Sequence, residues 1–207
     1  PCKLKAGLEV EQVNEEPRGM LLGMVLGDGY ITEAGSLVIK HAEAQRSYLE
    51  HKAKLLHSAL GGKAPSVRTI DNNGYPGCRV SKADSYFRVL RNWLYQGGTK
   101  RVAGPFLRFL TLHGLALWWM DDGSLYMKRR DGRVHAREGI LSLYTSQEEC
   151  LIVAARIEEL TSVYPKPVHH KGKFRLRFNT GMLQTFIPKV SPYAAPSMEY
   201  KFDLNYR

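Results

Sequence analysis

The chain has 207 residues, 43% of them hydrophobic, which suffices for one large domain or for two subdomains of about 100 residues each. Its formal charge is +10, with a net +5 in residues 1–102 and a net +5 in residues 103–207. No stretch approaches the roughly 20 apolar residues of a membrane span, and the N-terminus lacks the apolar core of a secretory signal. These features predict an intracellular protein with a polyanionic partner, nucleic acid before membrane.

The three cysteines, Cys2, Cys78 and Cys150, are isolated and odd in number. The sequence has no CxxC pair, which argues against a structural zinc site. Unpaired thiols are typical of a reducing compartment, so a bacterial cytoplasm or an organelle matrix is the expected location.

An internal repeat divides the chain. Residues 18–31 read RGMLLGMVLGDGYI and residues 112–126 read LHGLALWWMDDGSLY, so each is an apolar helical run that leads into Asp-Gly. Aligning the Asp-Gly pairs sets Asp28 against Asp122, which lies 94 residues later. That spacing is about half of the chain, and we therefore predict two fused copies of one unit.

Signals for two hairpins and two helices follow the first Asp-Gly pair. In chain order, the expected elements are a hairpin in residues 30–42 with its turn near Glu33–Gly35, an amphipathic helix at about Gln45–Leu60 closed by Gly61-Gly62, a strand pair in residues 66–81 with Asn73-Gly74 at its turn, and a helix at about Ser81–Tyr95.

The same signals follow the second Asp-Gly pair. They are a hairpin in residues 124–145 with its turn at Asp131-Gly132, a helix at about Ser146–Leu160 with Ser146 and Glu149 as a capping box, a strand pair in residues 166–179 with its turn near Lys171-Gly172, and a helix at about Thr180–Ile187.

Each half thus has the order αββαββα, an α+β unit with antiparallel sheets and not a doubly wound one. We expect an N-terminal half at residues 1–102 and a C-terminal half at residues 103–207, related by a pseudo-twofold axis. The join is expected near Gly97–Pro105.

Residues 173–178, KFRLRF, alternate cations with apolar side chains. The strand period of two puts the three cations on one face, which is also common for a solvated strand, but the lack of a carboxylate between them favours nucleic acid. A two-stranded ribbon fits the DNA major groove, where phosphate contacts set the register and polar side chains such as Ser142 and Tyr144 bind bases. The cations expected to bind DNA are Lys40, Arg68, Arg79, Lys82, Lys128, Arg129, Arg130, Arg133, Arg137, Lys171, Lys173, Arg175 and Arg177.

The two Asp-Gly pairs place carboxylates at the C-terminal ends of apolar helices, where carbonyls are unsatisfied and the helix dipole is negative. A bound cation makes this placement favourable, and carboxylate and carbonyl oxygens suit Mg²⁺. A single pair would more simply be a helix cap and turn. Two helices that approach through Gly19, Gly23 and Gly27 would instead bring two sites together, and metals roughly 4 Å apart suit phosphodiester displacement.

These two segments resemble the motif of the LAGLIDADG homing endonucleases, in their two-motif, single-chain form. The matches are LLGMVLGDG, Leu21–Gly29, and LALWWMDDG, Leu115–Gly123, with TKRV and PSMEYK resembling the basic segments of the two halves. The resemblance implies that Asp28 and Asp122 bind metal and that Gly27 and Asp121 contribute at the preceding motif position, chiefly through backbone carbonyls. It also implies one lysine per half beside the metals, Lys100 and Lys201, with Arg101 as the alternative to Lys100.

Several further expectations come with the resemblance. It implies a monomer whose sheets form a saddle on double-stranded DNA, with a long asymmetric target and one cut per strand across the minor groove. Two or three Mg²⁺ ions would be bound, Mn²⁺ would substitute, and Ca²⁺ would bind without supporting cleavage. Where some relatives have a polar residue after the first hairpin, this chain has Glu43 and Gln147, and a carboxylate there would repel phosphate.

Three other functions compete with this interpretation. An RNA maturase that acts on its own intron RNA has the same fold, although the presence of both acids favours the nuclease. A transcription factor on this scaffold would need a helix-turn-helix segment that the sequence does not show. A basic RNA-binding module would have no use for two matched Asp-Gly helices.

Overall fold

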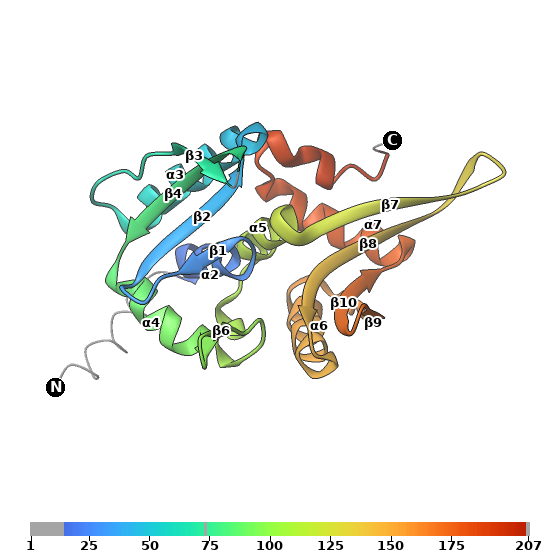
Figure 1. Ribbon diagram of the computed structural model, residues 1–207. Helices are drawn as coiled ribbons and strands as arrows, with labels where there is room; N and C mark the ends of the chain where they lie inside the picture. Colours follow the sequence, from blue (N-terminus) through green and yellow to red (C-terminus); the bar gives the residue numbers. More distant parts are fainter. Residues whose placement is uncertain (1–14, 73, 206–207) are drawn as a thin grey trace.

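The computed structural model describes residues 15–72 and 74–205 (Figure 1). Cys2 and Asn73 of the predicted turn lie outside these residues. The first half contains α2 (Glu15–Leu26), β1 (Gly29–Ile31), β2 (Ser36–Ala42), the short 3₁₀ helix η1 (Glu43–Gln45), α3 (Arg46–Leu60), β3 (Arg68–Asn72), β4 (Tyr75–Ala83) and α4 (Ser85–Leu94).

The second half repeats this order after a short connection. The connection contains β5 (Tyr95–Gln96), β6 (Thr99–Lys100) and η2 (Pro105–Phe109). The repeat contains α5 (Leu112–Asp122), β7 (Gly123–Arg130), β8 (Arg133–Thr145), α6 (Gln147–Thr161), β9 (Lys166–His170), β10 (Lys173–Phe178) and α7 (Thr180–Val190), and is followed by η3 (Ser191–Tyr193) and η4 (Pro196–Lys201).

Two antiparallel sheets of the same topology confirm the predicted α+β fold. Their strand orders are β1-β2-β4-β3 and β7-β8-β10-β9, so each half has a central pair formed by its second and fourth strands. Gly29, which ends the first motif, lies opposite Ile39 in the first sheet. Gly123, which ends the second motif, lies opposite Leu141 in the second sheet, so these two strand pairs correspond between the halves.

Helices α2 and α5 pack against each other at the centre of the molecule (Figure 1). Their backbones are in direct contact, because an added Cβ at Gly23 would lie 2.0 Å from the carbonyl oxygen of Gly114, and one at Gly114 would lie 2.0 Å from that of Gly19. At the end of α2, an added Cβ at Gly27 would lie 2.2 Å from a carboxylate oxygen of Asp121. The glycine spacing therefore brings the C-terminal ends of both helices together.

The residues at two predicted hairpin turns have positive φ angles. Asp131 and Gly132 have φ angles of 50° and 74°, and Lys171 and Gly172 have 49° and 77°, which suits the two-residue turns that match the twist of paired strands. The turn of β7 and β8 lies at the tip of a long hairpin that projects from the body of the molecule (Figure 1).

Some predicted boundaries were wrong. Strand β4 continues to Ala83, and α4 begins only after Asp84, whose carboxylate accepts from the backbone N–H of Tyr86 and so caps the helix. Ser146 caps α6 as predicted, but Glu149 forms an ion pair with Arg101 and does not complete a capping box. Helix α7 runs past the predicted end to Val190 and includes Pro188.

One face of each sheet packs on helices and the other is open. On β2, Leu37, Ile39 and His41 face the core, while Lys40 is exposed on the opposite face. The buried residues of both halves form one continuous hydrophobic cluster, in which Cys78 and Cys150 are buried and not joined in a disulfide. Among the residues described, no helix combines the length and apolar character needed to cross a membrane.

Candidate active site

The ends of α2 and α5 bring the two motif aspartates into one site. The side chain of Asp121 crosses between the halves, and its Oδ2 accepts a hydrogen bond from the backbone N–H of Asp28 at 3.0 Å. Asp122 ends α5 and is partly exposed, and Asp28 lies two residues after the last residue of α2 and is exposed. The carboxylates therefore meet at the surface between the two sheets.

Each helix end is contacted by one lysine of its own half. Lys100 Nζ donates to the carbonyl oxygens of Val25 at 2.8 Å and Gly27 at 2.8 Å. Lys201 Nζ donates to those of Met120 at 2.5 Å and Asp121 at 3.2 Å. A cation at a helix C-terminus is favourable because the dipole and the free carbonyls are negative there.

The connection between the halves explains why Lys100 takes this position. Gly97 and Gly98, with φ angles of 54° and 79°, form the turn of the β5–β6 hairpin, and Lys100 ends β6. Arg101 points elsewhere, because its guanidinium contacts Glu149 at 2.5 Å and Gln96 at 2.8 Å. Of the two cations considered from the sequence, the structure places Lys100 at the site.

The second half positions Lys201 through the indole of Trp119. This indole N–H donates to the carbonyl oxygen of Lys201 at 2.9 Å. The Trp119 ring is fully buried and packs edge-on against Phe178 and Phe186. No sequence pattern predicted this bond to the η4 segment.

Asp121 belongs to a buried network with helix α3. Its Oδ1 accepts from Tyr48 Oη at 2.8 Å and from Lys52 Nζ at 2.6 Å, and the side chains of Lys52 and Asp121 have 0% exposure. Lys52 Nζ also lies 3.2 Å from His41 Nε2, and His41 Nδ1 lies 3.5 Å from Asp28 Oδ2.

The other motif acid has a different partner. Trp118, one turn earlier on the same helix, donates its indole N–H to Asp122 Oδ2 at 3.1 Å. The ring is fully buried, so it fixes this carboxylate from the core side.

Desolvation and mutual repulsion act on the two motif acids. Desolvation, together with the carboxylates of Asp121 and Asp28, raises the pKa of Asp122 to about 7. Desolvation and Asp121 likewise raise the pKa of Asp28. Burial lowers the pKa of both Lys100 and Lys201. The lysines therefore do not fully offset the cost of charging the two acids, and an additional cation would.

The donor set fits a hard divalent cation. Carboxylates of Asp28 and Asp122 lie at helix ends whose carbonyl groups, including those of Gly27 and Asp121, are oxygen ligands of the kind that Mg²⁺ accepts. Ligand atoms of Asp28, His41 and Asp121 also lie within 4.8 Å of one another. The Asp121 carboxylate, however, already accepts three hydrogen bonds, which use most of its acceptor capacity.

A row of cations crosses the open face of the first sheet. Lys40 lies opposite Arg79, and Arg79 lies opposite Arg68 on the next strand. All three are exposed, and no carboxylate of the described residues forms an ion pair with them. Like charges directly opposite one another destabilise a sheet, so this row favours an anionic partner. Arg68 and Arg79 also line a surface groove with Ser66, Thr69, Ile70 and Ser81.

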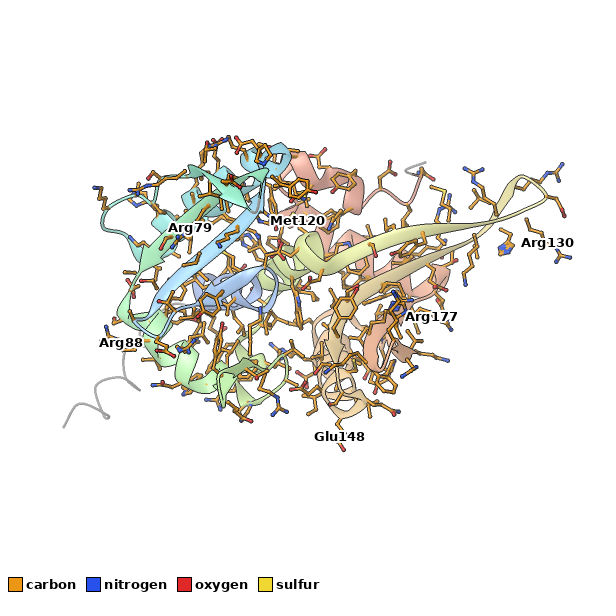
Figure 2. All side chains as sticks on the ribbon, viewed as in Figure 1. Arg79, Arg88, Met120, Arg130, Glu148 and Arg177 are labelled. Atoms are coloured by element: carbon orange, nitrogen blue, oxygen red, sulfur yellow. The ribbon has the colours of Figure 1, made fainter. Side chains whose placement is uncertain are left out.

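The second sheet has basic side chains on its open face and on its hairpin. Figure 2 shows Arg79 on the first sheet, Arg177 on the second, Met120 between them, and Arg130 at the hairpin tip. Lys171 and Lys173 are exposed, Arg175 and Arg177 are partly buried, and Ser142 and Tyr144 lie on β8, Tyr144 being 56% exposed. The exposed basic residues of the hairpin are Lys128, Arg129, Arg130 and Arg133.

Not every basic residue expected to bind DNA lies on an open face. Arg137 donates to the carbonyl oxygen of Leu204, and its backbone N–H donates to Thr180, so it lies on the helix-covered side of the sheet. Lys82 donates to the carbonyl oxygens of Gly61 and Lys63, where it caps the end of α3.

A carboxylate of the neighbouring strand lies near one cation of β10. Glu138 on β8 lies 3.8 Å from Arg177 and 2.7 Å from Lys128. The alternation of residues along β10 does not indicate this contact, because Glu138 belongs to the neighbouring strand. Glu43, which we expected to repel phosphate, forms an ion pair with Arg46.

Sequence reasoning missed Lys52, His41 and Tyr48. A single lysine in an amphipathic helix is typical of its solvated face, and a single histidine in a strand has no distinctive spacing. The one signal was Asp121, the extra acid that stands where the first motif has Gly27. Its burial required partners, which only the packing of α3 against the motif helices reveals.

Comparison with known families gives a match over most of the chain. Residues 18–186 match the LAGLIDADG DNA endonuclease family. The chain belongs to this family. Both motifs, with Asp28 and Asp122, lie within the matched residues, and Lys201 lies beyond them.

Two curated relatives show how far the likeness extends. A probable intron-encoded DNA endonuclease 3 of Mycosarcoma maydis is 34% identical over 123 residues, which cover 56% of this chain and 84% of that protein. Protein RecA of Mycobacterium gastri is 28% identical over 198 residues, which cover 88% of this chain and 46% of that protein. The chain thus spans about half the length of the RecA relatives that it matches.

Solved structures share the fold. The homing endonuclease I-WcaI bound to its DNA recognition sequence superposes with a TM-score of 0.76 at 20% identity, over 93% of this chain and 88% of that one. The meganuclease I-SmaMI bound to uncleavable DNA has a TM-score of 0.53 at 9% identity, over 88% of this chain and 87% of that one. These two structures show that the chain shares the fold of such endonucleases.

Proposed function

We propose that the chain is a site-specific homing endonuclease that hydrolyses one phosphodiester in each strand of double-stranded DNA. The observation that carries the proposal is the pairing of Asp28 and Asp122 at adjoining helix ends, each end contacted by its own lysine, between two basic sheet faces. Both acids belong to one chain, so we propose that it acts as a monomer.

Each residue of the site has a role that its position supports. Asp28 and Asp122, with the carbonyl groups of Gly27 and Asp121, would hold Mg²⁺ or Mn²⁺. The bound metal would supply Lewis acidity and a water of lowered pKa. Lys100 and Lys201 stand at the helix ends as positioned cations, and they would stabilise the charge that develops on each attacked phosphate.

The two open sheet faces would bind the DNA on either side of this site. The cation row of Lys40, Arg68 and Arg79 would contact backbone phosphates, and the long β7–β8 hairpin has the two-stranded form that the major groove accepts. Ser142 and Tyr144 on the second sheet would contact bases. The span of the two sheets supports a long, asymmetric target.

A cleavage selection on a randomised duplex library tests the proposal. With Mg²⁺ or Mn²⁺ we expect enrichment of one long asymmetric site cut in both strands, and with Ca²⁺ we expect the same site bound and uncut. Duplex binding without cleavage in all three ions would contradict the nuclease. Binding assays with intron RNA would then test the maturase alternative.

A further inference from the structure

Lys52 is a buried cation that the proposed chemistry does not use. Its side chain has 0% exposure, and its ammonium lies 2.6 Å from Asp121 Oδ1 and 3.2 Å from His41 Nε2. Removing both charges of such a pair from water is costly, and a buried ion pair is weak evidence for stability alone. Its partner Asp121 directly precedes a motif acid, which points to a role in the site.

The proton positions along this chain of contacts follow from the chemistry of the groups. An ammonium has donors only, so Nε2 of His41 must accept from Lys52. The hydrogen of the neutral imidazole is then on Nδ1, which faces Asp28 Oδ2 at 3.5 Å. His41 therefore directs its Nδ1–H toward the Asp28 carboxylate.

Among the described residues of the second half, the corresponding positions hold other side chains. Ile39 lies opposite Gly29 and Leu141 lies opposite Gly123, so Leu143 occupies the strand position that His41 has in the first half. Gly27 likewise stands in place of Asp121. Asp122 is bonded instead by the indole of Trp118, and the first motif has Met24 at that position.

We propose that Lys52 and His41 are positioning residues that orient Asp28, and that they make the two strand-cleavage sites chemically unequal. Asp121 anchors Lys52 from the other half, Lys52 sets the imidazole tautomer, and His41 holds the carboxylate. This inference rests on the proposed function. It assigns the asymmetry to four residues around the Asp28 carboxylate: Asp28, His41, Lys52 and, from the second half, Asp121.

Strand-resolved cleavage measures the inequality. The substrate is the selected target duplex, labelled separately on each strand. His41→Leu gives the first half the leucine that the second half has at this position. We expect this variant to cut one strand at least about 10-fold more slowly than the wild-type chain does. The other strand should stay within about 2-fold, so nicked circles accumulate from supercoiled plasmid. His41→Gln retains an N–H donor and should restore most of the lost rate.

A metal-free measurement tests the tautomer directly. The ¹⁵N shifts of the imidazole nitrogens, assigned by comparison with His41→Leu, should show hydrogen on Nδ1 and none on Nε2 in the wild-type chain. Lys52→Met should lose this preference, and Tyr48→Phe, which removes a different bond to Asp121, should keep it. Hydrogen on Nε2 in the wild-type chain would overturn the inference.

The outcomes separate this inference from the proposed function. If the wild-type chain cuts neither strand, the proposed function fails and the cleavage role of His41 and Lys52 fails with it. If the wild-type chain cuts both and His41→Leu slows the strands equally, only the inference fails. Where Lys52→Met does not fold, Lys52→Met combined with Asp121→Asn removes both buried charges, and the strand-selective loss should persist.

Discussion

Among the single residues, the two motif acids perform matching tasks in unlike surroundings. Asp28 faces an imidazole that is backed by a buried lysine, whereas Asp122 faces an indole of its own helix. Both have a raised pKa because they are desolvated beside other carboxylates. A cation bound between them would offset this electrostatic cost.

The first prediction concerns these acids. Asp28→Asn and Asp122→Asn should each reduce double-strand cleavage roughly 100-fold or more. Each removes a charge that, under the proposed function, would hold a metal ion, and such an ion stabilises the transition state by several kcal/mol. DNA binding in Ca²⁺, measured by gel shift, should remain because the basic faces are unchanged. Full cleavage by either variant would contradict the assignment.

The second prediction concerns the buried ion pair. Lys52→Met leaves the Asp121 charge without its partner and should lower the free energy of unfolding by about 3–5 kcal/mol. Lys52→Met combined with Asp121→Asn should be more stable than Lys52→Met alone, since no unpaired charge remains. Urea denaturation measures both values, and equal stability of the two variants would argue against a charged Asp121.

Among the helices and strands, the contact of α2 with α5 determines how close the two acids can lie. Gly19, Gly23 and Gly114 permit backbone contact, and the ends of both helices reach the same point on the surface. Glycine lowers intrinsic helix stability by about 1 kcal/mol relative to alanine, and the close packing of the helices offsets this cost.

The third prediction tests this contact. Gly23→Ala places a Cβ 2.0 Å from a backbone oxygen, so the helices must separate, and the free energy of unfolding should fall by about 1–3 kcal/mol. Gly181→Ala is the matched control, because an added Cβ there would meet its nearest neighbour at 3.6 Å. The control should be neutral or stabilising by up to about 1 kcal/mol, and a stabilising Gly23→Ala would refute the close crossing.

In the molecule as a whole, two sheets present basic open faces on either side of one acidic centre. The net charge of +10 is divided equally between the halves, which suits one polyanion lying across both. Arg137 and Lys82 do not contribute to these faces, because their side chains bind carbonyl groups in other parts of the chain.

The fourth prediction concerns salt dependence. Changing Lys40, Arg68 and Arg79 to Gln should weaken DNA binding and reduce the slope of log K against log salt by about 0.9 for each phosphate that the chain no longer neutralises. The control removes the same charge elsewhere, through Lys54→Gln, Lys63→Gln and Arg88→Gln, which are exposed outside this cation row. Similar slopes for both triple variants would exclude the cation row from the DNA interface.

Sequence patterns alone predicted the duplicated topology and the alignment of Asp28 with Asp122. Strands, turns and amphipathic helices depend on periods of 2 and 3.6 residues and on the local chemistry of Gly, Asn and Asp, all of which are evident over a few positions. The glycine spacing of α2 also predicted a close approach of the two motif helices, and the structure confirms it.

The surroundings of the acids, in contrast, depend on tertiary packing. Lys100 meets Val25 across 75 residues, Lys52 meets Asp121 across 69, and Asp121 meets the backbone of Asp28 across 93. Local sequence patterns do not predict such contacts, because the contacts depend on where whole helices pack. The choice of Lys100 over Arg101, the burial of Asp121 and the placement of His41 beside Asp28 therefore follow from packing, whereas the two acids follow from the repeat.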